Sequence, residues 1–253
     1  MDLGLRGKKA IVTGGTRGIG RAIAMLLAAE GADVAICARH REGVERTVTE
    51  LEGAGVGAVG GVVDVADLAA LRGWIGEAGA ALGGLDIFVA NVSALAQGMD
   101  EAAWRRGFEI DVMATVFGIE AALPLLEKSD SGAIVAVGST AMAEVYGPTR
   151  SYAAVKAALL PYIKGLARNL AAKNIRANMV SPGNVFFEGG VWDSVRRNNP
   201  DMFGQMLARN PTGRMGRPEE VANAVVFLAS PRASFITGTN LIIDGALTQR
   251  VQY

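Results

Sequence analysis

Tyr152 and Lys156 are the first residues whose types and spacing could do chemistry. They stand four positions apart in the otherwise apolar stretch "SYAAVKAALL", residues 151–160. On a helix, residues four apart lie on one face, about one turn from each other. A tyrosine phenol can give or accept a proton, and a neighbouring ammonium favours its ionised form. The spacing therefore indicates an acid–base pair, although two amphipathic side chains at the edge of a packed helix would give the same pattern.

A glycine-rich turn near the N-terminus could bind a phosphate. The stretch "TGGTRGIG" lies between an apolar run and a long apolar helical pattern, and Gly14, Gly18 and Gly20 follow a G-x-x-x-G-x-G spacing. Glycines let the backbone turn sharply and approach a ligand, and the free N–H groups of a helix N-terminus attract negative charge. Alone, such a cluster is usually a plain turn. Between a strand and a helix it predicts a nucleotide site.

The end of the second strand-like run bears on the choice of nucleotide. In NAD-binding proteins an acidic residue there accepts hydrogen bonds from the adenosine ribose. This chain has Ala38 and Arg39 at that point and no carboxylate. Arg39 and Arg17 could bracket a 2′-phosphate through charge-assisted hydrogen bonds, unless both are ordinary surface residues. The sequence therefore favours NADP(H) over NAD(H).

The elements that must position these residues follow from alternating patterns. Short apolar runs alternate with segments of 3.6-residue periodicity, such as residues 20–31 and 67–82. Apolar strands separated by helices indicate parallel β-α-β units, because strands covered on both faces need no polar side. We predict one α/β domain over residues 1–253, a Rossmann-type doubly wound sheet with helices on both faces. Its seven parallel strands are expected within residues 8–14, 32–38, 56–65, 85–91, 132–139, 175–183 and 239–245.

One long interruption follows the sixth predicted strand. Residues 183–216 contain two short helical patterns, at 190–197 and 200–209. In an α/β fold, a segment inserted after the carboxyl end of a strand lies at the ligand crevice, so we predict a substrate-binding lid. The segment is rich in aromatic residues and methionine, which could face an alicyclic, aromatic or fatty substrate or simply pack the lid on the body. These residues are Phe186, Phe187, Trp192, Met202, Phe203 and Met206, and three arginines, Arg196, Arg197 and Arg209, could meet a carboxylate.

Composition excludes several classes of function. Lys plus Arg and Asp plus Glu both total 25 in 253 residues, which argues against a nucleic-acid partner. There is no leader-like N-terminal segment, and no apolar run approaches the roughly 20 residues that cross a bilayer. Cys37 is the single cysteine and His40 the single histidine, so we expect no disulfide and no metal site. We therefore predict a cytoplasmic protein with a small-molecule substrate.

Taken in order along the chain, the motifs resemble the short-chain dehydrogenase/reductase family over nearly the whole length. They are "TGGTRGIG", the pair Asp64 and Val65, "YAAVK", "SPG" and the closing "GRPEEVANAVVFLASPRASFITGTNLIIDG". The resemblance implies an NAD(P)(H)-dependent oxidoreductase that interconverts a secondary alcohol and a ketone by hydride transfer. It also implies a homotetramer, or a dimer. Helices near residues 104–127 and 152–172 would pair across one interface and the C-terminal segment across another.

The resemblance also implies roles for individual residues. Tyr152 would be the general acid and base, assisted by Lys156, which would also bind the nicotinamide ribose. Ser139, thirteen residues before Tyr152, would bind the substrate oxygen. Asp64 would bind the adenine amino group, unless it merely caps the next helix. The implied cofactor-binding set is Gly14, Thr16, Arg17, Gly18, Ile19, Gly20, Arg39, Asp64, Val65, Asn91, Tyr152, Lys156, Pro182, Gly183 and Val185.

Three departures from the family pattern cluster around the expected nicotinamide site. Residues 90–93 read "ANVS" where N-N-A-G is usual, and Asp111 replaces an asparagine that assists the proton relay. Asp111 could hold the same water, or could partly cancel the charge of Lys156. Phe187 replaces a threonine that binds the carboxamide, a role that backbone groups or Asn184 could take over. We expect a working oxidoreductase, with Asp111 among its catalytic residues. The alternatives are non-redox chemistry such as dehydration or epimerisation, and a cofactor-binding sensor without turnover.

Overall fold

The computed structural model describes residues 2–145 and 150–251, and its centre is a parallel seven-stranded sheet. The strand order is β3-β2-β1-β4-β5-β6-β7, with every neighbouring pair parallel. This confirms the predicted fold class. The strands are β1 (Lys9–Thr13), β2 (Asp33–Ala38), β3 (Ala58–Val62), β4 (Ile87–Ala90), β5 (Gly132–Val137), β6 (Ile175–Pro182) and β7 (Asn240–Ile243).

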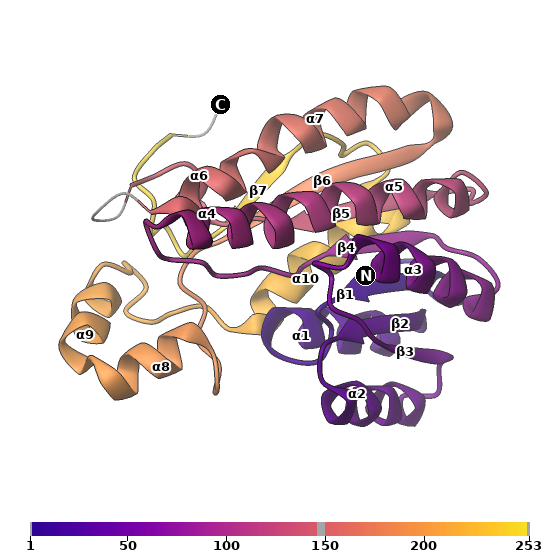
Figure 1. The fold of residues 1–253 in the computed structure, drawn as a ribbon. Helices are drawn as coiled ribbons and strands as arrows, with labels where there is room; N and C mark the ends of the chain where they lie inside the picture. Colours follow the sequence, from indigo (N-terminus) through magenta and orange to yellow (C-terminus); the bar gives the residue numbers. More distant parts are fainter. Residues whose placement is uncertain (1, 146–149, 252–253) are drawn as a thin grey trace.

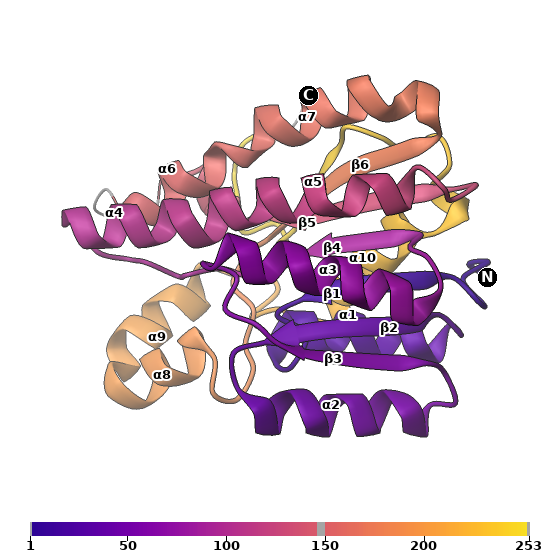
Figure 2. The same cartoon turned by 45° about the vertical axis from the view of Figure 1, so that its right-hand side comes forward.

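Helices cover both faces of this sheet, as Figures 1 and 2 show. Buried residues of α1, α2 and α10 pack on one face, and those of α3, α5 and α7 on the other. The helices are α1 (Gly18–Ala29), α2 (Arg41–Gly53), α3 (Leu68–Leu82), α4 (Glu101–Gly107), α5 (Ala114–Leu126), α6 (Ser151–Ala157), α7 (Leu159–Leu170), α8 (Val191–Asn198), α9 (Pro200–Ala208) and α10 (Pro218–Ala229). Short helical turns are η1 (Phe108–Met113, π-helical), η2 (Thr140–Met142), η3 (Ala171–Lys173) and η4 (Pro231–Ala233).

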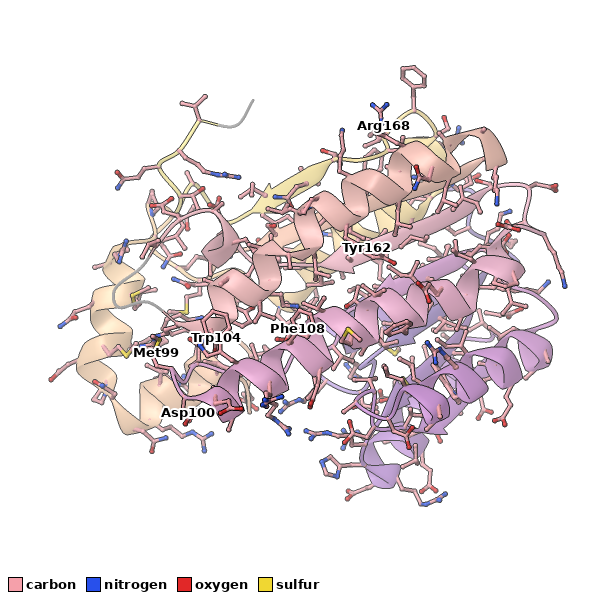
Figure 3. All side chains as sticks on the ribbon, turned by 45° about the horizontal axis from the view of Figure 1, so that its top comes forward. Met99, Asp100, Trp104, Phe108, Tyr162 and Arg168 are labelled. Carbon is pink, nitrogen blue, oxygen red and sulfur yellow. The ribbon has the colours of Figure 1, made fainter. Side chains whose placement is uncertain are left out.

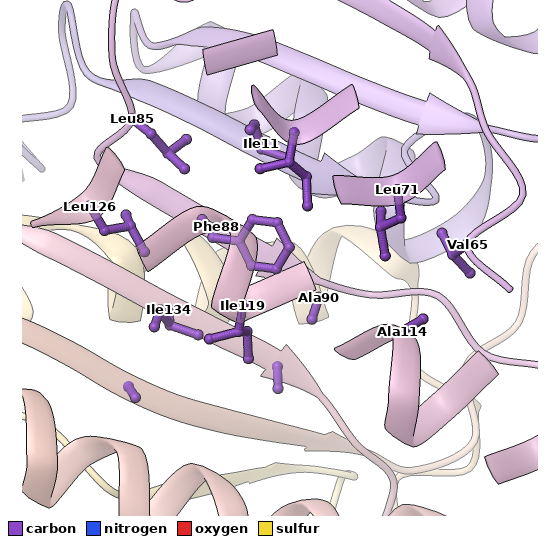
Figure 4. Packing of buried hydrophobic residues seen from close by; sticks show 14 of the residues in the cluster. Ile11, Val65, Leu71, Leu85, Phe88, Ala90, Ala114, Ile119, Leu126 and Ile134 are labelled. Carbon is purple, nitrogen blue, oxygen red and sulfur yellow. The ribbon is translucent and has the colours of Figure 1, made fainter. Parts of the chain in front are cut away.

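The alternation of side chains along each strand divides the core into two layers. Ile11 of β1 packs with the α3–α5 layer, whereas its neighbour Val12 packs with the α1–α10 layer. Figure 4 shows the first layer around Phe88 and Ile119, both fully enclosed. Because both faces of β4, β5 and β6 are covered, their residues are buried without alternation, which explains the continuous apolar runs in the sequence.

Local signals explain where two helices begin and end. The side chain of Asp67 accepts hydrogen bonds from the N–H groups of Ala69 and Ala70 and caps α3, and Gly83 ends that helix with a φ of 72°. Asp67, and not Asp64, is therefore the helix cap. Buried Arg176 of β6 donates hydrogen bonds to the carbonyl groups of Leu228, Ala229 and Ser230, which closes the C-terminal end of α10.

The segment 183–216 forms the two predicted short helices, α8 and α9. Both lie beyond the carboxyl ends of the strands (Figure 1). Its two ends are joined by a parallel bridge between Val185 and Gly216. Within the described residues, no helix has the length and apolar character that crossing a membrane requires.

Candidate active site

A cavity of about 1300 Å³ opens at the carboxyl ends of the strands. Its wall includes the glycine-rich turn, the segments that follow β2 to β6, helix α6 and part of the lid. Sites for one small molecule usually measure roughly 300–1000 Å³, so this cavity has room for a dinucleotide beside a substrate.

The three residues expected to carry the chemistry all line this cavity. Tyr152 and Lys156 lie one turn apart on α6, and Ser139 follows β5. The hydroxyl oxygen of Ser139 accepts a hydrogen bond from the N–H of Ala141 at 3.2 Å. Its own hydrogen is therefore the part of the group that can be donated to a ligand.

Helix α6 is held in place by Ser151, a residue that the sequence did not single out. Its buried hydroxyl lies 3.0 Å from the carbonyl oxygens of both Ala96 and Gly98. This contact ties the first turn of α6 to the segment between β4 and α4. The only signal in the sequence is the position directly before Tyr152.

Lys156 is buried, and its ammonium has two protein partners. The Nζ atom donates a hydrogen bond to the carbonyl oxygen of Val137 at 3.0 Å and lies 2.9 Å from Oδ1 of Asp111. The side chains of Lys156 and Asp111 are only 2% and 1% exposed. The second carboxylate oxygen of Asp111 accepts a hydrogen bond from the N–H of Ala94 at 3.0 Å. A buried ammonium is costly unless it is paired, and Asp111 supplies that pair from behind the cavity wall.

The glycine-rich turn has the features of an anion site. No side chain of the described residues caps the N-terminus of α1, so its first N–H groups are available to a ligand. A Cβ atom on Gly20 would lie 2.1 Å from the carbonyl oxygen of Gly14, so only glycine permits this close packing. Asn91 fastens the turn to β4, because its amide donates hydrogen bonds to the carbonyl oxygens of Thr13 and Gly14.

Most of the expected cofactor-binding residues lie on the same wall. Arg17 and Arg39 are exposed there, and neither forms an ion pair within the part of the chain that the structure describes. Cys37 lies nearby, but burial raises the pKa of its thiol to about 12, so it is a small neutral residue at neutral pH. The other members of the expected set on the wall are Gly14, Thr16, Ile19, Gly20, Asp64, Val65, Asn91, Pro182, Gly183 and Val185.

Gly18 is covered by the lid. A Cβ atom built on Gly18 would lie 2.5 Å from the ring of Phe187, so the ring rests directly on the turn. In another part of the cavity wall, the side-chain nitrogen of Asn184 is buried with no hydrogen-bond partner among the described residues. An unpartnered amide on the wall of the cavity is suited to a ligand carbonyl such as a carboxamide. The glycine cradle and this amide both fit a nicotinamide dinucleotide.

Some of the aromatic and methionine residues of the lid face the cavity, and others pack within the lid. Phe187, Trp192, Met202 and Met206 line the cavity, whereas Phe186 and Phe203 pack edge to face, with ring centres 6.1 Å apart.

Arg196 and Arg197 form ion pairs within the lid. Each lies 2.9 Å from a carboxylate oxygen of Asp193. The N–H of Gly189 and these two arginines hold the pKa of Asp193 below its ordinary value. Both arginines therefore serve the lid itself, while Arg209 lines the cavity.

Comparison with known proteins agrees with the motifs. A family model described as "Enoyl-(Acyl carrier protein) reductase" matches residues 14–248. Isoepoxydon dehydrogenase patN of Penicillium expansum is 38% identical over 257 residues, covering 100% of this chain and 99% of that protein.

Two solved structures superpose closely and hold different cofactors. A 7α-hydroxysteroid dehydrogenase complexed with NADH and 7-oxo glycochenodeoxycholic acid has a TM-score of 0.90 and 31% identity, with 99% and 98% of the two chains covered. L-Sorbose reductase from Gluconobacter frateurii, complexed with NADPH and L-sorbose, has a TM-score of 0.91 and 30% identity, with 99% and 100% covered.

Proposed function

Because the chain belongs to the short-chain dehydrogenase/reductase family, we propose that it prefers NADP(H) and that Tyr152 moves the proton that accompanies each hydride transfer. The protein is an NAD(P)(H)-dependent oxidoreductase that interconverts a secondary alcohol and a ketone. The observation that carries the proposal is the meeting of Ser139, Tyr152 and Lys156 on one cavity wall with the uncapped start of α1.

The proposed mechanism assigns one task to each side chain. The bound dinucleotide supplies the hydride in reduction and accepts it in oxidation. In reduction, the hydroxyl of Tyr152 gives its proton to the carbonyl oxygen while the carbon gains the hydride, and oxidation reverses both transfers. Lys156 stabilises the phenolate that this leaves. Ser139 donates its hydroxyl hydrogen to the same oxygen, while its own oxygen accepts a hydrogen bond from the N–H of Ala141.

The preference for NADP(H) rests on charge. Arg17 and Arg39 are exposed on the wall that includes the end of β2, and no carboxylate stands at that point to repel a phosphate. Guanidinium groups form charge-assisted bonds with phosphate oxygens. The two related structures hold NADH and NADPH respectively, so the residues of this chain must decide the preference.

We also propose that residues 183–216 form a lid over an apolar substrate. Trp192, Met202 and Met206 line the cavity from this segment, and methionines adapt to varied shapes. The ring of Phe187 already rests on the cofactor-binding turn, so the lid contacts both halves of the site. An alicyclic, aromatic or fatty ketone fits this lining.

A homotetramer, or a dimer, remains our prediction for the assembly. Met99, Trp104 and Phe108 are exposed on α4, η1 and the segment before them, and Figure 3 shows them on the outer face that α7 shares. Exposed aromatic side chains of this kind are typical of interfaces between subunits. A cytoplasmic location also remains a prediction, consistent with the single reduced cysteine.

The decisive experiment is a stopped-flow survey of ketones with NADPH and NADH. We expect oxidation of the reduced cofactor by at least one class of apolar ketone. The Tyr152→Phe variant should bind the cofactor normally and lose turnover by roughly two to four orders of magnitude. Undiminished turnover in that variant would refute the role of Tyr152. Tight binding of both cofactors without oxidation by any ketone class would favour the sensor, or the non-redox alternative if a substrate is dehydrated or epimerised.

A further inference from the structure

Asp111 and Lys156 form a fully enclosed ion pair directly behind the proposed acid–base residue. The ammonium and Oδ1 are 2.9 Å apart, and both side chains are almost completely buried. The carboxylate is fixed from a second side by the N–H of Ala94. The π-helical turn η1 brings Asp111 to this place, and its backbone carbonyl accepts a hydrogen bond from the hydroxyl of Thr115 at 2.8 Å.

The pair has no net charge, and this changes what Tyr152 experiences. Lys156 reaches the cavity wall one helical turn from Tyr152, while Asp111 lies farther back. The ammonium favours a phenolate on Tyr152, and the carboxylate behind it cancels part of that effect. A neutral amide at position 111 would leave the charge of Lys156 uncompensated.

The negative charge of Asp111 also acts on the cofactor. Because hydride and proton go to the two atoms of one carbonyl group, the nicotinamide must lie beside Tyr152. An oxidised nicotinamide carries one positive charge and a reduced one carries none. The buried carboxylate behind Lys156 therefore favours the oxidised form relative to the reduced form.

Other charged groups also face the cavity, and a substitution at position 111 leaves them unchanged. Arg106, Glu144 and Arg150 lie on the wall around α6, and Arg17, Arg39 and Asp64 lie around the glycine-rich turn. His40 and Arg209 also line the wall, and Glu109 is an exposed residue of η1. Asp111 and Lys156 pair with each other.

We propose that Asp111 is a positioning residue that neutralises Lys156, and that it thereby sets both the pH range of each reaction direction and the relative affinity for the two cofactor forms. The proposal rests on the proposed role of Tyr152. With Asp111 in place, Lys156 stabilises a phenolate on Tyr152 less than it would beside a neutral amide, which favours ketone reduction over alcohol oxidation. The overall equilibrium between alcohol and ketone is unaffected, since a catalyst cannot alter it.

The test compares wild type with Asp111→Asn, using Thr115→Val as the matched control. Thr115→Val disturbs the same helix by removing the hydrogen bond to the Asp111 carbonyl but leaves the carboxylate charge. In Asp111→Asn, the pH at which alcohol oxidation is half-maximal should fall below that of wild type. Thr115→Val should leave that pH unchanged.

Binding gives a second readout that does not depend on turnover. Fluorescence titrations should show that Asp111→Asn weakens NADP⁺ binding several-fold more than NADPH binding. Equal effects on both cofactor forms, or an equal pH shift in Thr115→Val, would overturn the proposal.

If the variant does not fold, the pH dependence of the wild-type reactions still tests the proposal. An amide can serve only one of the two N–H donors that meet the carboxylate, so thermal unfolding should first confirm that Asp111→Asn is folded. In wild type, ketone reduction should persist above neutral pH while alcohol oxidation still rises. Oxidation that is already independent of pH at neutrality would also overturn the proposal. Tyr152→Phe with full turnover would instead remove the proposed function itself.

Discussion

At the scale of single residues, Arg39 offers the sharpest test of cofactor choice. Its guanidinium is exposed on the cavity wall, and no carboxylate stands directly after β2. A charge-assisted hydrogen bond contributes about 1.5–3 kcal/mol, so Arg39→Ala should raise the KM for NADPH roughly tenfold to a hundredfold. The KM for NADH should change little, because that cofactor lacks the 2′-phosphate.

Steady-state kinetics with both cofactors measure this difference. Arg41→Ala is the matched control, since Arg41 is an exposed neighbour that already pairs with Glu45 at 3.6 Å. Equal changes for NADPH and NADH in Arg39→Ala would exclude a contact with the 2′-phosphate.

Sequence alone could identify Tyr152, Lys156 and Ser139, because their types and spacings follow from helix geometry and from motifs. It could not predict that Asp111 touches Lys156 directly, since this contact depends on the π-helical turn in η1. The contact between Phe187 and Gly18 depends on how the lid folds back, which no local pattern fixes.

At the scale of elements, Arg176 joins the centre of the sheet to α10. It is buried in β6 and donates hydrogen bonds to three carbonyl groups at the end of that helix. Replacement by methionine would leave these carbonyls without partners, at a cost of about 1–3 kcal/mol for each buried group left unsatisfied. We expect Arg176→Met to lower the free energy of unfolding by about 3 kcal/mol or more.

Urea unfolding measures this loss. Arg46→Ala, on the exposed surface of α2, is the control and should stay within about 0.5 kcal/mol of wild type. If Arg176→Met is as stable as wild type, water must form hydrogen bonds with the carbonyl groups at the end of α10.

The junction between the lid and α10 should be sensitive to acid. Glu220 receives two hydrogen bonds from Arg214, at 2.6 and 2.8 Å, and one from the N–H of Arg217. These partners, Arg214 first, lower the pKa of Glu220 from its ordinary 4.5 to about 2. The contribution of Glu220 to stability is therefore complete above about pH 4.5 and is lost as the pH falls toward 2.

Unfolding measured as a function of pH tests this junction. We expect Glu220→Gln to be less stable than wild type at neutral pH, with the difference shrinking between pH 4.5 and 2. A difference that is constant across this window would show that the charge of Glu220 is not responsible.

The order of elements was largely predictable, because parallel strands buried on both faces produce distinctive apolar runs. The third strand is an exception, since the run over residues 56–65 gives a strand only at Ala58–Val62. Val63 pairs back to Ala38, and Asp64 then forms a tight turn with Ala66. Hydrophobicity continues past the end of the strand because Val63 and Val65 still enter the core.

At the scale of the whole molecule, exposed aromatic side chains predict how copies assemble. Trp104 and Phe108 are 39% and 49% exposed on the face shown in Figure 3. A tetramer with two kinds of interface should fall to a dimer when one interface is disrupted. The double variant Trp104→Glu with Phe108→Glu should therefore halve the mass measured by light scattering.

Val62→Glu is the control for this experiment, since Val62 is also apolar and exposed but lies on the edge strand β3. An unchanged mass in the double variant would show that the interface does not include Trp104 and Phe108. A monomeric wild type would show that the predicted assembly is wrong.

The anchoring of Lys156 also determines when its side chain loses conformational entropy, during folding or during substrate binding. A free lysine side chain loses about 1.5–2 kcal/mol of rotational freedom when it is immobilised. Here the carbonyl group of Val137 and the carboxylate of Asp111, both part of the protein itself, hold the ammonium. That entropy is lost once, when the chain folds, and not again at each turnover. The site is thus preorganised, and the energy of substrate binding stays available for aligning the reacting atoms.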